Sequence, residues 1–178
     1  QITSGSSAWF YDLVWSPNSK MIAFSDRTLQ LKYIDVNTGV VKVVDKATEN
    51  EIRGYSFSPD SKWITYVKES ENSHTAVWVY NTHTGEAKQL TTDEFSDFSP
   101  VFSKCGKYLY FMSNRNYNLN FSSHEFAYLY NRATRIFALA LTHESPVIFK
   151  HKEDVEAVKA EKKAATPAKS KKKKGKAA

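Results

Sequence analysis

WSPNSKMIAF, residues 15–24, returns as FSPDSKWITY at residues 57–66 and as FSKCGKYLYF at residues 102–111. The three segments begin 42 and then 45 positions apart. Each has an aromatic residue, a Ser-led turn and a run of aromatic and aliphatic residues in the same order. A repeat of this length indicates an array of equivalent units, such as a solenoid or a propeller.

Two further markers keep the same register. Asp-Val-Asn-Thr-Gly at 35–39 is answered by Asn-Thr-His-Thr-Gly at 81–85, and Gln-Ile-Thr at 1–3 by Gln-Leu-Thr at 89–91. The offsets are 46 and 88, or one and two periods. Independent markers with one period are hard to obtain by chance, so the chain is predicted to consist of structural repeats.

Each repeat is interpreted as short antiparallel strands. In Ser-Pro-Asn/Asp-Ser, Pro presets φ for a turn, while Asn or Asp bonds its own backbone and tolerates the left-handed conformation. The Thr-Gly turn supplies Gly where φ must be positive. The segments rich in aromatic and β-branched residues suit strands. The expected second strands are 21–25, 63–68 and 108–113, the third are 29–35 and 76–81, and the fourth are 40–44 and 87–91.

The third repeat departs from this pattern after Phe111. Residues 114–123 are polar and rich in Asn, 126–130 are predicted to form a strand, 131–134 a turn, and 135–141 a closing strand. No helical periodicity occurs in the repeats, so the fold class is all-β.

Four antiparallel strands in a period of 40 to 45 residues are typical of a β-propeller blade, and the repeat favours a propeller over a β-sandwich. We expect about three four-stranded blades within residues 1–149, with repeats near 1–46, 47–91 and 92–142. Complete propellers have about four to eight blades. The sequence therefore predicts part of a propeller, with residues 1–3 as the outer strand of a preceding blade, and a start at Gln rather than Met fits a fragment.

The basic charge of the chain belongs to its C-terminal segment. Residues 150–178 hold 11 of the 25 Lys and Arg but 4 of the 19 Asp and Glu, which leaves residues 1–149 with a net charge of −1. We expect 150–178 to be a disordered or marginally helical linker or tail. Its Lys-rich end could bind polyanions by counterion release, with Lys169, Lys171, Lys172, Lys173, Lys174 and Lys176 as the cations.

The Ser-Pro-Asp-Ser-Lys-Trp-Ile repeat resembles TolB-like propeller repeats in general. The segment LNFSSHEFAYLYNRATRIFALAL at 119–141, followed by Ser145-Pro146, is more specific. It resembles the end of the second propeller of tricorn-like proteases, and the resemblance covers residues 1–149. Phe137 stands where that pattern would have Tyr, while His124 and Glu125 fill a less fixed site.

This resemblance implies a large serine peptidase whose propellers admit, filter or guide peptides toward a PDZ-containing catalytic region. Those modules lie C-terminal to the propeller, so no catalytic residue is carried over to this chain. Its implied partners are peptides or unfolded polypeptide, the remaining blades, the PDZ and peptidase domains, and other copies of the parent. A cytoplasmic location is expected, with the periplasm as the alternative, and no apolar run is long enough for a membrane span.

The residues themselves favour no enzymatic site. Ser122-Ser123-His124-Glu125 is the natural candidate for a nucleophile and base, but neighbours on a strand point to alternate faces. Cys105 is expected in an exposed turn without a neighbouring base. Because the five histidines lack metal-ligand spacing, we expect no metal or cofactor and surface positions for His74, His83, His124, His143 and His151. The Asn120-Phe121-Ser122 sequon carries no weight without evidence of secretion.

Aromatic residues recur in phase with the repeat, which favours packing between blades over a stacking platform for nucleic acid or glycan. They are Trp9, Phe10, Tyr11, Trp15, Tyr55, Phe57, Trp63, Trp78 and Tyr80. Residues of the inner strands near a propeller channel would be the ones to touch a peptide, for example Tyr11, Asp12, Arg53 and Asp97.

Three functions therefore stay open. The leading hypothesis is a non-catalytic propeller segment that scaffolds or guides peptides in proteolysis by a tricorn-like serine peptidase. The second is a TolB-like propeller that binds a protein partner. The third is a propeller fragment with a polyanion-binding tail, for which nucleic acid is the less favoured partner because the blade region carries no basic excess.

Overall fold

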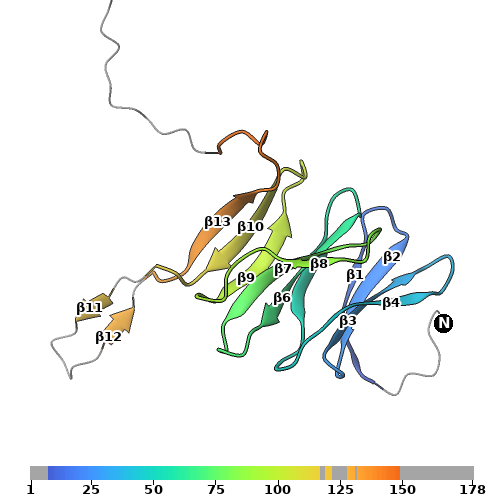
Figure 1. The fold of residues 1–178 in the computed structure, drawn as a ribbon, viewed down its shortest axis with the longest axis horizontal. Helices are drawn as coiled ribbons and strands as arrows, with labels where there is room; N and C mark the ends of the chain where they lie inside the picture. The colour runs from blue at the N-terminus through green and yellow to red at the C-terminus, as the bar shows by residue number, and fades with distance from the viewer. Residues whose placement is uncertain (1–7, 117–118, 122–127, 131, 149–178) are drawn as a thin grey trace, which may run out of the picture. The chain divides into compact units, whose positions relative to one another are not determined.

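The computed structural model describes residues 8–116, 119–121, 128–130 and 132–148 (Figure 1). Regular structure in these ranges is β-strand throughout, in antiparallel sheets. The described ranges hold no helix of the length and apolar character that crossing a bilayer requires. The predicted all-β class is confirmed for this part of the chain.

The first two repeats each form a four-stranded sheet in which consecutive strands are neighbours (Figure 1). The first blade contains β1 (Phe10–Trp15), β2 (Met21–Asp26), β3 (Gln30–Asp35) and β4 (Val41–Lys46). The second blade contains β5 (Arg53–Phe57), β6 (Trp63–Glu69), β7 (Thr75–Asn81) and β8 (Ala87–Gln89). The four-stranded blade predicted from the repeat is therefore present twice.

The third blade differs from the prediction of four strands. Its sheet has the order β13-β10-β9, with β9 (Asp97–Phe102), β10 (Tyr108–Ser113) and β13 (Arg135–Ala140). The expected closing strand is thus the direct neighbour of the second strand, because β10 and β13 pair without a register shift over six residues. Strands β11 (Leu119–Phe121) and β12 (Tyr128–Tyr130) pair with each other in a separate two-stranded sheet.

In all three blades, the backbone N–H at the start of the second strand donates to Oγ of the turn Ser, and in the first two that hydroxyl also donates to Asn18 or Asp60. In the second blade, the backbone N–H of Trp63 donates to Ser58 Oγ at 3.0 Å, and the Ser58 hydroxyl donates to Asp60 Oδ1 at 2.5 Å. The N–H of Lys62 also donates to Asp60 Oδ1, at 3.2 Å. The left-handed residue is the one after the Asn or Asp, as Ser61 has φ of 60°. The Asx side chain stabilises the turn, as predicted, but its own backbone is not the left-handed position.

The hydrophobic core lies between blades. One cluster joins the first and second blades and includes the fully buried Leu31, Ile64 and Tyr66. The other joins the second and third blades around Val77 and Leu109. Blades therefore stabilise one another through their faces, as stacked repeats must when one unit cannot bury its own apolar face.

The aromatic residues predicted to pack between blades divide into two groups. Tyr55, Phe57 and Tyr80 are buried, and the half-buried Trp78 packs against the first cluster. Trp9, Phe10, Trp15 and Trp63 are exposed by 38 to 74%, and Tyr11 is intermediate. Three of the exposed side chains belong to the first blade or lie just before it, where no preceding blade exists among the described residues to cover them.

By contacts within the chain, residues 1–146 form one unit and 147–178 another. The predictions for the outer strand at 1–3 and for the Lys-rich tail at 150–178 fall outside the described residues. The boundary expected after residue 149 stays a prediction.

Candidate functional site on the inner strands

Strands β1, β5 and β9 form the candidate site because each is the edge strand of its blade and they follow one another in space. β1 contacts β5, and β5 contacts β9. They carry all four inner-strand residues that the sequence analysis selected: Tyr11 and Asp12 on β1, Arg53 on β5 and Asp97 on β9. In a propeller, these edge strands line the central channel.

Each inner strand is broken by a bulge at the same place in the repeat. The pairing register shifts between Tyr11 and Val14 in β1, and the same irregularity occurs in β5 and β9. A residue with positive φ sits in each bulge: Asp12 at 26°, Gly54 at 60° and Ser99 at 53°. Bulges re-aim side chains and are frequent beside functional sites.

Tyr55 of the second blade packs against the bulge in β1 of the first blade. Its hydroxyl lies 3.1 Å from the carbonyl oxygen of Tyr11, contacts that of Asp12, and accepts a hydrogen bond from the N–H of Ser25 at 3.1 Å. Burial raises the pKa of Tyr55, so the hydroxyl stays protonated and able to donate. The bulge is thus held rigidly by the neighbouring blade.

Pro100 occupies the same place in the third blade. It is buried, its ring lies 3.9 Å from the point where a side chain on Gly54 would begin, and its carbonyl oxygen accepts a hydrogen bond from Ser56 Oγ at 3.4 Å. The corresponding residue of the first blade is Leu13, which is 69% exposed. Tyr55 and Pro100 each contact the preceding blade, whereas Leu13 has no preceding blade to contact among the described residues.

Arg53 and Tyr11 contact each other across β1 and β5, and the exposed Asp12 follows Tyr11 on β1. The Arg53 guanidinium lies 5.4 Å from the centre of the Tyr11 ring, and its Nη2 is 3.2 Å from Glu51 Oε2. The Arg53 side chain is 60% exposed, and Asp12 is also exposed. The resulting strip presents an aromatic ring, a cation and carboxylates, which can bind an extended peptide through stacking and charge.

Asp97 does not belong to this strip. It is fully buried at the start of β9, where both carboxylate oxygens accept hydrogen bonds from Arg115 Nη2 at 2.7 and 3.0 Å. The Arg115 guanidinium lies 4.8 Å from the centre of the Phe137 ring and 5.7 Å from that of Phe111. The Asp97 carboxylate is thus buried and occupied by Arg115, so a contact between Asp97 and a peptide is not supported.

The remaining described candidates lie apart from the inner strands. His83 and His143 are exposed, whereas His74 is half-buried and its Nδ1 lies 3.0 Å from Ser96 Oγ. Cys105 is an exposed turn thiol, as predicted, and its hydrogen bond with Ser103 lowers its pKa. In the described ranges, no three His, Cys, Asp or Glu residues gather closely enough to hold a metal ion.

Several candidates lie outside the described residues. These are Ser122, Ser123, His124, Glu125, His151 and the six lysines of the tail.

Some members of the site gave no clear signal in the sequence. The Gly in position 54 could have indicated a bulge inside a strand, but Asp12 and Ser99 occupy the equivalent places without being Gly. Aligning the three repeats at this position would have shown that Leu13, Tyr55 and Pro100 are equivalent.

The repeat, the bladed sheets and the inner-strand bulges can now be compared with known proteins. The family described as "Tricorn protease second beta propeller domain" matches residues 1–176. The chain belongs to this family. The predicted resemblance is therefore confirmed.

Curated relatives are tricorn proteases and their homologues. The chain is 24% identical over 149 residues to tricorn protease homolog 1 of Streptomyces coelicolor, which covers 84% of this chain and 14% of that protein. It is 29% identical over 132 residues to the tricorn protease of Thermoplasma volcanium, which covers 71% of this chain and 13% of that protein. The chain thus spans about one seventh of the length of these relatives.

Solved structures show the same fold. The crystal structure of the tricorn protease superimposes with a TM-score of 0.72 at 22% identity, over 78% of this chain and 14% of that one. TolB from Acinetobacter baumannii superimposes with a TM-score of 0.52 at 21% identity, over 72% of this chain and 33% of the TolB chain. The chain is a partial β-propeller of the tricorn family, and the broader likeness to TolB propellers is also confirmed.

Proposed function

We propose that this chain is a non-catalytic propeller segment that guides peptide substrates along its inner strands in a tricorn-like serine peptidase. The observation that carries the proposal is the strip formed by the half-buried Tyr11 and the exposed Asp12 and Arg53 on adjoining edge strands. Family membership supports a propeller of a protease as its setting.

The geometry suits transit rather than tight binding. Arg53 is held over Tyr11 by a contact that is about 0.5–1 kcal/mol at an exposed site. The rigid bulge behind it, fixed by Tyr55, keeps the strip in place without a deep pocket. An extended peptide can then make several weak contacts and still move on.

The proposal includes the partners of the parent protein. The exposed Trp9, Phe10 and Leu13 would be covered by a preceding blade. PDZ and peptidase domains would follow the propeller, the parent would be a homo-oligomer, and the cytoplasm would be its compartment.

A TolB-like interaction module is the second candidate, favoured by the structural likeness to TolB propellers. In that case, the inner strip would contact a folded protein partner. Binding of a folded protein but not of unfolded peptides would support this alternative over peptide guidance.

The test uses Arg53→Ala and Tyr11→Ala in the complete polypeptide that carries this chain. For a peptide substrate of about twelve residues, each variant should lower kcat/KM about tenfold, the effect of losing about 1.4 kcal/mol of contact. Hydrolysis of a two-residue chromogenic substrate should be unchanged, since it is too short to reach the strip and the peptidase region together.

Lys88→Ala is the matched control, because Lys88 is an exposed cation on the outer strand β8. It should leave both substrates unaffected. Equal losses for the long and short substrates, or no loss for either, would contradict peptide guidance by the inner strands.

A further inference from the structure

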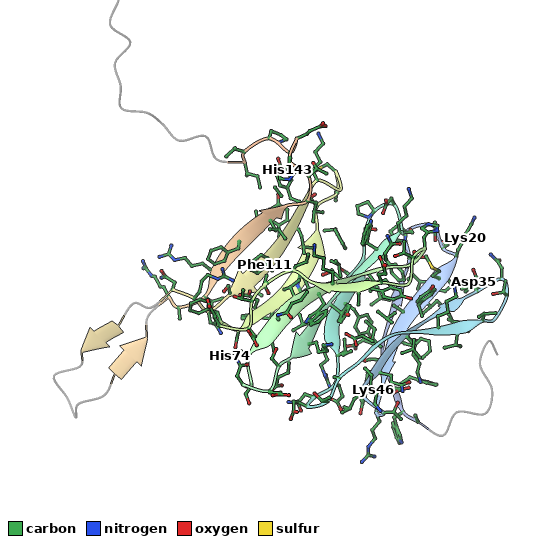
Figure 2. All side chains as sticks on the ribbon, in the orientation of Figure 1. Lys20, Asp35, Lys46, His74, Phe111 and His143 are labelled. Atoms are coloured by element: carbon green, nitrogen blue, oxygen red, sulfur yellow. The ribbon has the colours of Figure 1, made fainter. Side chains whose placement is uncertain are left out.

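A second place on the molecule has the form of a binding site. A cavity of about 500 Å³ lies between the first and second blades, at the end that carries the Ser-led and Thr-Gly turns. Figure 2 shows Lys20 and Asp35, which line it, at one end of the first blade, and Lys46 at the other end. Ligand pockets commonly have volumes of about 300–1,000 Å³.

The two carboxylates of the cavity are engaged by the turns. Asp35 accepts hydrogen bonds from the N–H groups of Asn37 and Thr38 at 3.0 and 2.9 Å, and the bond from Thr38 lowers its pKa. Burial would raise the pKa of Asp60, but hydrogen bonds from Ser58 and the Lys62 N–H outweigh it and lower the pKa. Both carboxylates are therefore charged, and each stabilises its turn by accepting hydrogen bonds.

Three lysines of the cavity form no close ion pair, although Lys20 lies near enough to Asp35, and Lys62 near enough to Asp60, to help lower the pKa of each carboxyl. Lys20, Lys42 and Lys62 all line the cavity, and none forms an ion pair with another residue in the described ranges. Lys42 lies 5.9 Å from the centre of the Tyr33 ring. The lysines that line the cavity outnumber its carboxylates by one, which favours a ligand with a single negative charge.

The cavity also has an apolar part, formed by Met21, Tyr33 and Val40. The Tyr33 ring is buried against the second blade, and its hydroxyl lies 3.4 Å from the carbonyl oxygen of Thr82. Val40 is 52% exposed, so its side chain is open to a ligand. The ligand should therefore combine one negative charge with an apolar group.

We propose that this cavity, the interblade pocket, binds the C-terminal residue of a peptide. The α-carboxylate lies among Lys20, Lys42 and Lys62, and an apolar terminal side chain packs on Met21, Tyr33 and Val40. A doubly charged group such as phosphate fits less well, because Asp35 and Asp60 repel the second charge. The site lies apart from the inner strip and goes beyond the proposed guidance of peptides.

The next blade shows which residues give the pocket its selectivity. Tyr33 pairs with Lys42 across β3 and β4, and at the same register of the second blade Val79 pairs with Lys88. Glu86 follows the Thr-Gly turn there, where the first blade has Val40. The equivalent place thus has a lysine but lacks the aromatic ring and carries an added carboxylate.

The test is isothermal titration of the full chain with acetyl-Ala-Ala-Leu as the free acid, as its C-terminal amide, and with inorganic phosphate. The free acid should bind about tenfold more tightly than the amide, as expected for loss of a charge-assisted contact. Phosphate should bind no more tightly than the amide. Equal binding of the acid and the amide, or tighter binding of phosphate, would overturn the proposal.

Variants locate the site. Lys42→Met should weaken binding of the acid about tenfold, whereas Lys88→Met, at the equivalent position of the next blade, should change it less than twofold. Val40→Glu places the second-blade residue in the pocket and should also abolish the preference for the acid. Equal effects of Lys42→Met and Lys88→Met would contradict the assignment.

Arg53→Ala separates this proposal from the proposed function. Arg53 lies on the inner strip and does not line the pocket. The variant should leave the preference for the free acid unchanged, even if it impairs the hydrolysis of long peptides. Loss of the preference in Arg53→Ala would mean that the acid binds at the inner strip and would overturn the pocket.

Discussion

The first two blades and the third share their inner halves but differ in their outer halves. All three have the Ser-led turn and an inner-strand bulge at the same place in the repeat. The first two then continue to a third and fourth strand, while the third pairs β10 directly with β13 and sends β11 and β12 into a sheet of their own. The part of the repeat nearest the inner strands is therefore the more constant one.

Charged side chains pair both between blades and within a blade. Between the first and second blades, Asp45 on β4 accepts hydrogen bonds from the Tyr66 hydroxyl at 2.7 Å and from Lys68 Nζ at 2.8 Å. In the third blade, Arg115 and Asp97 pair within the same blade, as Lys32 and the buried Asp26 do in the first. The Asp45 arrangement joins neighbouring blades, and the Arg115–Asp97 pair stabilises a blade whose sheet has three strands among the described residues.

Removing the third blade's ion pair should have the largest effect. Arg115→Met leaves the fully buried Asp97 carboxylate without its cation, so the free energy of unfolding should fall by about 3 kcal/mol. Lys68→Met is the control in the second blade, because Asp45 is partly exposed and keeps its bond to Tyr66. Lys68→Met should lower the free energy of unfolding, measured by urea titration, by less than half as much as Arg115→Met. Equal losses would mean that the two arrangements are equivalent.

The Ser-led turns should respond alike in every blade. Ser16→Ala, Ser58→Ala and Ser103→Ala each remove the hydroxyl that accepts the N–H at the start of the second strand. Leaving that group without a partner should cost about 1–3 kcal/mol in each case. A much smaller cost at Ser103, measured by thermal unfolding, would show that the third blade's turn is not equivalent to the other two.

The bulges give a pair of changes with opposite sign. At Gly54, φ is 60° and a Cβ would meet only ordinary contacts, so Gly54→Ala should cost about 1–2 kcal/mol through backbone strain. Ser99→Gly, in the equivalent bulge, should relieve strain and gain up to about 1 kcal/mol. The free energies of unfolding from urea titrations would test both, and a loss in Ser99→Gly would contradict the equivalence.

The smallest expected effect is on acid stability in the first blade. Burial would raise the pKa of Asp26, but hydrogen bonds from Lys32 at 2.6 Å and Thr28 outweigh it and lower the pKa. A lowered folded-state pKa means that the stabilisation is present above the ordinary pKa of 3.8 and is lost as the pH falls through the folded value. The third blade has uncharged Ser113 at the equivalent position.

Urea midpoints between pH 6 and pH 3 would measure this contribution. Asp26→Asn should flatten the fall in stability below about pH 4, while Ser113→Ala should leave the slope of the wild type. An unchanged slope in Asp26→Asn would assign the acid response to other carboxylates.

The sequence predicted the features that depend on local chemistry. The Ser-led turns, the positive φ of Gly39 and Gly85, and the strands of the first two blades follow from residues that are close in sequence. The pairing of β10 with β13 could not be predicted, because 21 residues separate the two strands and either 126–130 or 135–141 could have been the neighbour.

For the site, the structure places Tyr11, Asp12 and Arg53 on the inner strands with access to solvent, but it buries Asp97. That the first three contact a peptide stays a prediction. Arg115, the partner of Asp97, lies 18 residues away, just beyond the end of β10, and nothing in the local pattern indicates that the two meet. Whether an inner-strand carboxylate faces solvent or a buried cation is decided by packing, which one sequence does not show.

Hydrogen exchange of the full chain with and without an unfolded peptide of about twelve amidated residues tests peptide guidance most directly. The amide end keeps the peptide from the interblade pocket. The account predicts added protection in β1, β5 and β9 and none in the outer strands β4 and β8. Protection confined to the outer strands, or no change in the three inner strands at saturating peptide, would contradict it.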